Sequence, residues 1–163
     1  MRKTVYLSLG SNLGRRDANL RVAIDRVGGL GEVKAVSSLY ETEPVEFIAQ
    51  PWFLNLALEL ATELMPKQLL TALLKIERDM GRRRFQPKGP RLIDIDILLF
   101  GDTVMNDTKL VIPHPAMHER KFVLEPLAEI APEKRHPVLK KTVRELLDAL
   151  PRGAPVVKKV AEN

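Results

Sequence analysis

The chain has 163 residues, of which 45% are hydrophobic and 29% charged, so it is long enough to bury a core and too apolar for a disordered segment. It contains no cysteine, which excludes disulfides and thiolate metal sites and leaves carboxylates and three histidines as possible metal ligands. The formal net charge of +5 suits an anionic partner such as a nucleotide. At this length we expect a single domain over residues 1–163. Because no segment has the pattern of a signal peptide or a membrane span, we expect a cytoplasmic location.

The first part of the chain is predicted to run strand, turn, helix. Residues 5–9 have the composition of a short strand, and residues 10–14, Gly-Ser-Asn-Leu-Gly, are rich in turn formers. A helix is expected to begin near Asp17, a suitable N-cap, and to end at the glycines of residues 28–31. The glycine loop could approach a phosphate, but its composition favours a plain turn.

Two further strands are predicted at residues 33–42 and 53–61, on either side of a loop that contains prolines. In the second strand alternate leucines form one face, which should pack on helices. Phe53 and Asn55 share the opposite face, which is therefore available for another role. A second amphipathic helix is expected over residues 66–81.

The remaining elements complete a β-α-β-β-α-β order. Residues 93–100 form the next predicted strand, short extended segments follow near 104–105 and 110–112, and an amphipathic stretch covers residues 143–150. This order predicts an α+β fold, a ferredoxin-like βαββαβ sandwich with additional C-terminal strand and helix elements. The tail after about residue 151 is expected to be loosely attached.

Two aspartates inside the apolar strand at 93–100 are the most informative pattern in the chain. Asp94 and Asp96 alternate with isoleucines, so a strand of period two places both carboxylates on one face, with their backbones about 6.6 Å apart. Unpaired charges would be costly there. Either cations bind between the carboxylates, as Mg²⁺ would with water and phosphate oxygens as its other ligands, or the acids form an ion-pair ladder with Arg91. The spacing alone favours neither interpretation.

A basic run lies directly before these aspartates. Within residues 82–91 the basic side chains are Arg82, Arg83, Arg84, Lys88 and Arg91. On its own, such a run is more often a solvated loop than a binding site. Its position next to two acids at strand spacing favours phosphate binding, which uses fixed cations together with metal ions. Neither the P-loop pattern nor the dinucleotide-binding fingerprint occurs in the sequence.

The segment from Lys88 to Gly101, KGPRLIDIDILLFG, closely resembles the signature of the hydroxymethyldihydropterin pyrophosphokinases of folate biosynthesis. Other segments resemble further parts of that family in order and spacing, namely Leu9–Leu13, Ser37–Thr42, Gln50–Asn55, Pro113–Pro115 and Glu119–Leu124. The resemblance covers most of residues 5–132.

This resemblance implies an enzyme that transfers the β,γ-diphosphate of ATP to the hydroxymethyl group of 6-hydroxymethyl-7,8-dihydropterin and releases AMP. It implies that Asp94 and Asp96 bind two Mg²⁺ ions, and that Arg82 and Arg91 are catalytic and contact the transferred group. Arg91 then becomes a phosphate partner rather than the counter-ion of the aspartates. The family's nucleotide contacts match Glu77, Arg84, Lys88, Ile97, Lys109, His114 and Arg120. Without the resemblance, Glu77 would be interpreted as a solvated helical acid paired with a neighbouring arginine.

The resemblance also implies a set of pterin contacts. Phe53 and Phe122 match two rings that sandwich the flat heterocycle, and Asn55 offers both a donor and an acceptor to its edge. Thr42 and Val45 match loop positions whose backbone completes the recognition. Without the resemblance, both phenylalanines are more typical of a hydrophobic core.

The implied partners are therefore small molecules, ATP and a reduced pterin, with neither nucleic acid nor membrane, and no oligomeric state follows from the sequence. The alternative hypothesis is a ferredoxin-like nucleic-acid-binding module, suggested by the basic charge and the element order. That module would need an aromatic-rich strand motif to stack bases, which the chain lacks, and its aspartates would face phosphates without a metal.

Overall fold

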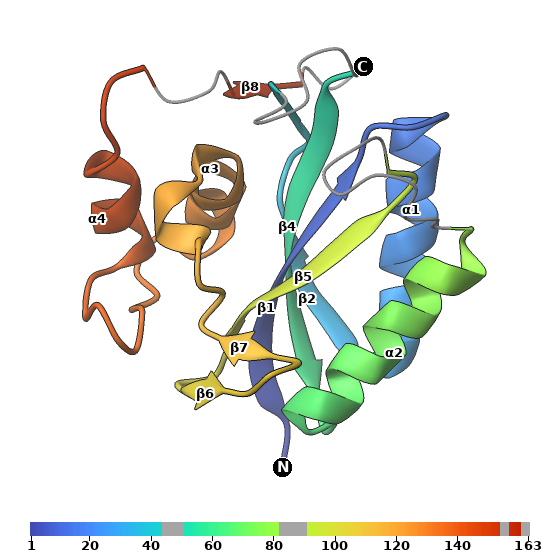
Figure 1. Cartoon of the computed structure of the whole chain (residues 1–163), viewed down its shortest axis with the longest axis horizontal. Coiled ribbons are helices and arrows are strands. Elements are labelled where there is room, and N and C mark those ends of the chain that lie inside the picture. Colours follow the sequence, from blue (N-terminus) through green and yellow to red (C-terminus); the bar gives the residue numbers. More distant parts are fainter. Residues whose placement is uncertain (44–50, 82–90, 154–156, 161–163) are drawn as a thin grey trace.

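The computed structural model of the chain describes residues 1–43, 51–81, 91–153 and 157–160. It is a mixed α+β structure in which a six-stranded sheet has helices on both faces (Figure 1). The strands of this sheet are β1 (Lys3–Ser11), β2 (Glu32–Val36), β3 (Tyr40–Thr42), β4 (Phe53–Thr62), β5 (Asp94–Phe100) and β8 (Val157–Lys159). The other described elements are α1 (Arg16–Val27), α2 (Pro66–Asp79), α3 (Lys121–Ile130), α4 (Val143–Asp148), the two-stranded sheet of β6 (Met105–Asn106) and β7 (Val111–Ile112), and the 3₁₀ turns Gly28–Leu30 and Met117–Glu119.

The order of strands places β1 in the interior of the sheet. The order is β5-β1-β4-β3-β8, with β2 also paired to β4, and the described pairings are antiparallel. β5 therefore lies at one edge, and its first residues lie beside the last residues of β1. The beginning of β4 lies on the other side of the same end of β1.

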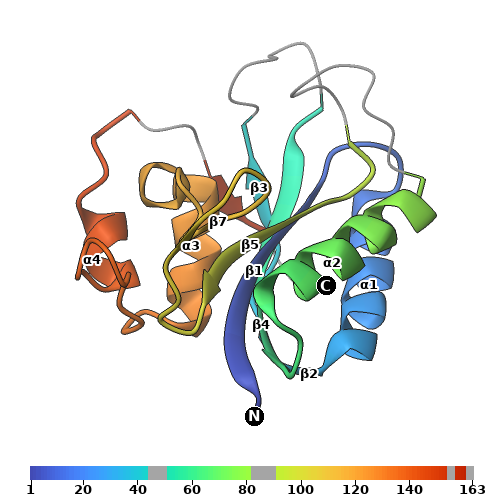
Figure 2. The ribbon, with the colours of Figure 1, turned by 60° about the horizontal axis from the view of Figure 1, so that its bottom comes forward.

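One face of the sheet is the apolar face that the sequence predicts. Alternate leucines of β4 are at most 5% exposed and pack with side chains of β1, β5, α1 and α2. These leucines are Leu54, Leu56, Leu58 and Leu60. The prediction that they pack on helices is confirmed, and α1 and α2 cover this face (Figure 2).

The middle of the opposite face packs against the C-terminal helices. A second core cluster joins Tyr6 and Ala57 of the sheet to side chains of α3 and α4, among them Leu124 and Val143. α3 is also held to the sheet by Glu129, whose carboxylate accepts hydrogen bonds from the Ser38 N–H (2.8 Å) and the Tyr40 hydroxyl (2.6 Å). Burial, together with this carboxylate, raises the pKa of Tyr40. The sheet thus lies between two helical layers, the arrangement visible in Figures 1 and 2.

The strand expected at residues 33–42 is split into β2 and β3. Ser37 interrupts it, because the Ser37 N–H donates to the Ala57 carbonyl (2.9 Å) while the Ser37 hydroxyl accepts the Ala57 N–H (2.9 Å). A side chain that replaces a backbone partner in this way breaks the regular ladder.

The described part of the tail after residue 151 contains β8. This strand pairs with β3 from Thr42 opposite Val157 to Tyr40 opposite Lys159. The pairing covers the backbone groups that β3 would otherwise expose at the sheet edge. Lys158 of β8 also lies 6.0 Å from the centre of the Trp52 ring. Within the described residues, no helix is both long and apolar enough to cross a bilayer.

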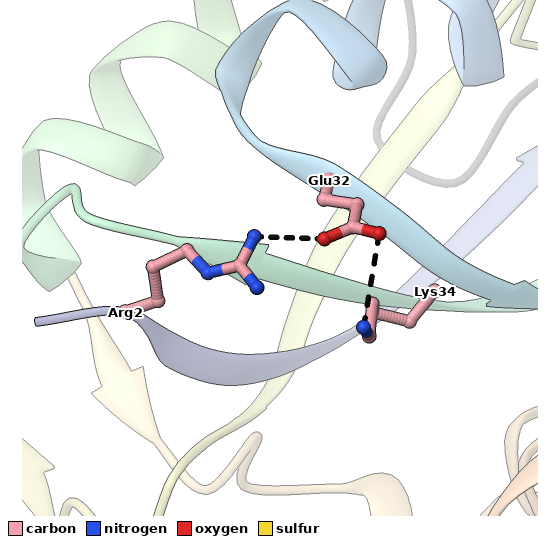
Figure 3. Close-up of polar contacts among 3 residues, drawn as sticks. All are labelled: Arg2, Glu32 and Lys34. Carbon is pink, nitrogen blue, oxygen red and sulfur yellow. Dashed lines mark hydrogen bonds and ion pairs between the residues drawn. The ribbon is translucent and has the colours of Figure 1, made fainter.

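An exposed group of charges lies at the start of β1 (Figure 3). Arg2 Nη1 is 2.8 Å from Glu32 Oε1, and Lys34 Nζ is 3.7 Å from Glu32 Oε2. The side chains of Arg2 and Glu32 are 50% and 53% exposed. The two basic groups lower the pKa of Glu32, the Arg2 hydrogen bond having the largest effect.

Candidate active site

Three adjacent strands bring Asp94, Gly10 and Asn55 into one row near the end of β1. Gly10 is paired with Asp94 of β5 on one side and with Asn55 of β4 on the other. Asp96 lies two residues further along β5, opposite Ser8. Ile95 and Ile97 are buried in the core beneath α1 and α2, so the two aspartates lie on the other face, as the alternation predicts.

Gly10 forms a floor for this row. A Cβ at residue 10 would overlap Asn55 Oδ1 and would lie 3.4 Å from Phe53 Cδ1. The missing side chain therefore lets the Asn55 amide and the Phe53 ring lie over β1. An amide, an aromatic ring and a carboxylate thus meet on three neighbouring strands.

A buried hydrogen bond fixes the Asn55 amide. Asn55 Nδ2 donates to Thr42 Oγ1 at 2.6 Å, and the two residues are 4% and 2% exposed. Thr42 is paired with Phe53 in the ladder between β3 and β4. The structure thus brings together Thr42, Phe53 and Asn55, which the sequence predicts as pterin contacts, whereas Val45 lies outside the described residues.

Arg91 and Asp94 form an ion pair at the entry to β5. Arg91 Nη1 lies 3.3 Å from Asp94 Oδ2, and the side chains are 23% and 22% exposed. The expectation that Arg91 would not serve as a counter-ion is therefore wrong for Asp94. A nearby cation stabilises a half-buried carboxylate, and three residues of separation bring this arginine within reach of Asp94.

The donor set fits a cation that keeps part of its water shell. Among the described residues there is no group of three or more side chains able to hold a metal ion. Two carboxylates at alternate positions of one strand instead suit Mg²⁺, which takes its remaining ligands from water and phosphate oxygens. Asp94 and Asp96 can therefore hold Mg²⁺ together with a bound phosphate chain.

Glu77 of α2 is buried against the edge of β5. Its side chain accepts the backbone N–H of Ile95 at 2.7 Å, and the residue is 3% exposed. This contact fixes the backbone between the two aspartates and excludes the interpretation of Glu77 as a solvated helical acid. Its role as a nucleotide contact stays a prediction.

His114 lies beside β5 with a defined tautomer. Its backbone N–H donates to the Leu98 carbonyl (2.9 Å), and its Nδ1 accepts the Ala116 N–H (3.2 Å). Burial lowers the pKa of His114, the charge of Arg120 lowers it further, and Asp94 acts in the opposite direction. The ring is therefore neutral at pH 7, and the hydrogen bond to Nδ1 assigns the proton to Nε2.

Arg120 and Phe122 are neighbours at the start of α3. Arg120 Cζ lies 5.6 Å from the centre of the Phe122 ring, which is half-buried against the second core cluster. The geometry is that of a cation–π contact. A residue predicted for the nucleotide and one predicted for the pterin are thus in direct contact.

Other predicted nucleotide contacts lie further along β5 or outside the described residues. The side chain of Ile97 is 5% exposed in the core, so a nucleotide could reach its backbone alone. Lys109 belongs to the β6–β7 hairpin, which lies near the C-terminal end of β5, whereas Asp94 is at the other end of that strand (Figure 1). An ion pair between Asp107 and Lys67 (2.8 Å) joins this hairpin to the start of α2. Three predicted residues lie outside the described part of the chain, namely Arg82, Arg84 and Lys88.

Asn12 is a buried polar residue for which the sequence alone predicts no role. It is 1% exposed and contacts the backbone of both Pro51 and Arg91. The signal in the sequence is an amide directly after a buried strand, because such a group has to find hydrogen-bond partners inside the fold. Which partners it finds depends on segments distant in the sequence.

Paired carboxylates on an edge strand, with an arginine and a neutral histidine beside them, form a donor set of the kind that metal-dependent phosphotransferases use. Residues 6–132 match the family model described as 7,8-dihydro-6-hydroxymethylpterin-pyrophosphokinase (HPPK). The chain therefore belongs to the HPPK family, a family of ATP-dependent pyrophosphokinases.

Individual relatives differ in how much of their length is matched. The 2-amino-4-hydroxy-6-hydroxymethyldihydropteridine pyrophosphokinase of Aquifex aeolicus is 41% identical over 142 residues, which cover 87% of this chain and 89% of the relative. The enzyme of the same name from Bacillus subtilis is 46% identical over 132 residues, covering 80% and 79%. The folic acid synthesis protein fol1 of Pneumocystis carinii is 44% identical over 137 residues, 83% of this chain, but the chain spans only 18% of that protein's length.

Solved structures agree with the fold. An HPPK-DHPS protein of Plasmodium falciparum superimposes with a TM-score of 0.76 at 22% identity, over 91% of this chain and 44% of that one. At this identity the likeness establishes the fold, and the family assignment rests on the sequence matches.

Proposed function

We propose that the chain transfers the β,γ-diphosphate of ATP to the hydroxymethyl group of 6-hydroxymethyl-7,8-dihydropterin and releases AMP. The observation that carries this proposal is the row of Asp94, Gly10 and Asn55, which joins a carboxylate to an amide and an aromatic ring across three strands. Membership of the HPPK family supports the class of reaction.

The site divides into two halves on either side of Gly10. We call Thr42, Phe53 and Asn55 the pterin half, and Arg91, Asp94 and Asp96 the phosphate half. The two halves lie on opposite sides of β1, because β4 and β5 are its two neighbours in the sheet. A substrate bound in each half would meet the other above the end of β1.

The pterin half recognises a flat heterocycle by its edge and its faces. Asn55, whose amide is fixed by Thr42, offers its remaining donor and acceptor capacity to the pterin edge. Phe53 stacks on one face of the pterin, and Phe122 stacks on the other face. Arg120 covers one side of the Phe122 ring, so Phe122 uses its opposite side for this contact. Val45 completes this set in the proposal.

In the phosphate half, Asp94 and Asp96 would hold two Mg²⁺ ions, which when bound neutralise the triphosphate and polarise the β-phosphorus. Arg91 exchanges its ion pair with Asp94 for oxygens of the transferred group, and Arg82 is the second arginine in contact with that group. The neutral His114 donates its Nε2–H to a phosphate oxygen without adding positive charge next to Arg120.

The transfer itself is a substitution at the β-phosphorus. The hydroxymethyl oxygen forms a bond to this phosphorus while the bond to the oxygen that bridges the α- and β-phosphorus atoms breaks. That oxygen leaves with AMP, and the hydroxyl proton passes to water. Because the reaction needs little covalent chemistry from the protein, placement and electrostatics supply most of the catalysis.

The adenosine of ATP would extend along β5 away from the carboxylates. β5 has seven residues, so it spans about 20 Å. The residues proposed for the nucleotide follow this path, from Glu77 at the start of the strand, past the backbone of Ile97, to Lys109 on the hairpin. Arg84, Lys88 and Arg120 complete the proposed contacts.

The wider assignments are also proposals. We propose that residues 1–163 act as one pyrophosphokinase domain in the cytoplasm, with small molecules rather than nucleic acid or membrane as partners. We further propose a ferredoxin-like βαββαβ core, for which the strand order β5-β1-β4, continued by β2 and β3, is the support.

An assay of AMP release tests the proposed function. AMP should form from ATP when both Mg²⁺ and 6-hydroxymethyl-7,8-dihydropterin are present, and omission of either should abolish it. AMP formation that does not depend on the pterin would contradict the proposal. Complete absence of AMP formation would also contradict it. If AMP does not form, salt-sensitive binding of single-stranded RNA would support the nucleic-acid-binding alternative.

A further inference from the structure

Asn12 lies where β1 ends, between the starts of the two strands that carry the two halves of the site. β1 ends at Ser11, which is paired with Leu54 of β4, and the preceding Gly10 is paired with Asp94 of β5. Asn12 follows directly and is 1% exposed. A buried amide at this junction has to be satisfied inside the fold, and its partners come from both sides.

On the side of the phosphate half, Asn12 and Arg91 are joined by two hydrogen bonds. The backbone N–H of Asn12 donates to the Arg91 carbonyl at 3.0 Å, and Asn12 Oδ1 accepts the Arg91 N–H at 2.7 Å. On the side of the pterin half, Asn12 Nδ2 donates to the Pro51 carbonyl at 3.1 Å. One residue thus holds two distant backbone segments at a fixed separation.

Each of these segments leads directly into one half of the site. Pro51 precedes Phe53 by two residues, and Arg91 precedes Asp94 by three. The backbone positions that Asn12 fixes therefore set where β4 and β5 enter the site.

Arg16, by comparison, makes contacts next to the pterin half. Its guanidinium donates to the Trp52 carbonyl at 2.9 Å and lies 3.2 Å from Glu41 Oε1. Both partners adjoin the pterin half, so Arg16 fixes that half internally. Asn12 differs because one of its partners, Pro51, adjoins the pterin half and the other, Arg91, belongs to the phosphate half.

We propose that Asn12 is a positioning residue that sets the separation of the pterin half from the phosphate half. This inference rests on the proposed function, in which an oxygen bound in one half attacks a phosphorus bound in the other. A misplacement of about 1 Å can slow such a reaction about 100-fold, even when it arises far from the reacting atoms. Each half keeps its own binding groups when Asn12 is replaced, so separate binding of each substrate persists while transfer slows.

The test compares two replacements of Asn12 with a matched control. Asn12→Ala removes the side-chain contacts to Arg91 and Pro51, whereas Asn12→Asp keeps an acceptor for Arg91 and loses the donor to Pro51. The control is Asn19→Ala, because Asn19 Nδ2 bonds to Ser11 Oγ (3.2 Å) and the Leu13 carbonyl (2.9 Å) in the same loop.

We expect kcat for AMP formation to fall about 10- to 100-fold in Asn12→Ala and hardly at all in Asn19→Ala. In Asn12→Asp it should fall at least as much as in Asn12→Ala, because a buried carboxylate oxygen would then face the Pro51 carbonyl. The dissociation constants of the pterin alone, and of a Mg²⁺-bound nonhydrolysable ATP analogue alone, should change little in any variant. An unchanged kcat in Asn12→Ala would overturn the inference. So would a loss of both separate affinities as large as the loss of kcat, because that result indicates general structural damage.

Hydrogen exchange of the ligand-free protein provides a readout that needs no activity. Backbone amides at the starts of β4 and β5 should both exchange faster in Asn12→Ala and at the wild-type rate in Asn19→Ala. If Asn12→Ala does not fold, Asn12→Ser, which keeps a small neutral polar side chain, provides the same comparison. Unaltered exchange at both strand starts would overturn the inference whatever the enzyme does. Absence of AMP formation by the wild-type chain would overturn the proposed function, while the exchange comparison would still decide whether Asn12 joins the two strand starts.

Discussion

The two ends of β1 both carry ion pairs, and they differ in what surrounds the charges. At the start of the strand, Arg2 and Glu32 are about half exposed and Lys34 lies nearby in water (Figure 3). At the other end, Arg91 and Asp94 are 23% and 22% exposed and lie beside the glycine floor. Exposed pairs are screened by water and salt, whereas half-buried charges interact more strongly.

The second difference is how the backbone around the charges is held. At the end of β1, Asn12 binds the backbone of Arg91, and Glu77 binds the backbone N–H of Ile95. These buried contacts fix the strand on both sides of Asp94 before any ligand arrives. Such support distinguishes a preorganised site from a surface ion pair.

The largest expected difference between the two ends is in catalysis. Asp94→Asn and Asp96→Asn should each lower kcat for AMP formation about 100- to 1000-fold, because each removes one of the two carboxylates proposed to hold Mg²⁺ against the transferred phosphates. Glu32→Gln makes the same change of charge at the other end of β1 and should leave kcat unchanged. The measurement is steady-state AMP formation at several Mg²⁺ concentrations. Equal kcat values for all three variants would remove the distinction between the ends.

The glycine floor should be the next most sensitive feature. Gly10→Ala places a Cβ against Asn55 Oδ1 and so displaces the amide proposed to bind the pterin edge. If the cost of overpacking, about 1 to 3 kcal/mol, is paid on binding, pterin affinity falls about 5- to 150-fold. The matched control is Gly29→Ala, because a Cβ at Gly29 has no neighbour within 4 Å. Calorimetric titration with the pterin measures the effect. Similar affinities in the two variants would show that Gly10 does not shape the site.

Periodicity in the sequence was sufficient to predict the layers of the fold and the face of each strand. The alternation of leucines in β4 and of isoleucines in β5 located the core, and therefore also the face that carries Asn55 and the two aspartates. These features are local, since each depends on neighbouring residues of one strand.

Contacts between distant segments could not be predicted in the same way. The burial of Glu77 depends on where α2 crosses the edge of β5, and the partners of Asn12 come from two separate strand entries. β8 has three residues and no apolar alternation, so nothing local indicates its pairing with β3. The Arg91–Asp94 ion pair was one of two interpretations that the spacing left open.

Glu77 should affect stability more than an exposed acid on the same helix. Glu77→Ala leaves the buried Ile95 N–H without its carboxylate acceptor, which costs about 1 to 3 kcal/mol of unfolding free energy, whereas Glu77→Gln keeps an acceptor oxygen and should cost less. Urea unfolding of both variants measures this, with Asp79→Ala as the control. A larger loss in Asp79→Ala would contradict the structural role of the buried contact.

Acidification should weaken the side of the fold that carries His114 and His136. Burial lowers the pKa of both rings, and His136 Nδ1 accepts the N–H groups of Val138 (3.2 Å) and Leu139 (3.0 Å). As the pH falls below about 6.5, the unfolded chain therefore binds protons on these histidines before the folded protein does. The free energy of unfolding decreases as the pH falls from about 6.5 toward the folded pKa values, by at most about 1.4 kcal/mol per pH unit for each ring. Urea unfolding between pH 7.5 and 5.5 measures the slope, which His136→Gln should reduce. A slope of opposite sign would contradict the neutral state of the rings.

The smallest effect is expected at the start of β1. Arg2→Ala should raise the pKa of Glu32 toward its usual 4.5, because the Arg2 hydrogen bond is the largest influence that lowers it. A lowered carboxyl pKa stabilises the fold above pH 4.5, and this contribution is lost as the pH falls through the folded pKa. The variant should therefore be slightly less stable than the wild type at pH 7 and equally stable at a pH below the folded pKa of Glu32. Carboxyl NMR titration measures the pKa, and urea unfolding at low and high salt measures the stability. Because both side chains are exposed, the small loss of stability should vanish at high salt. A loss that persisted at high salt would mean that the Arg2–Glu32 pair is as little screened as the Arg91–Asp94 pair.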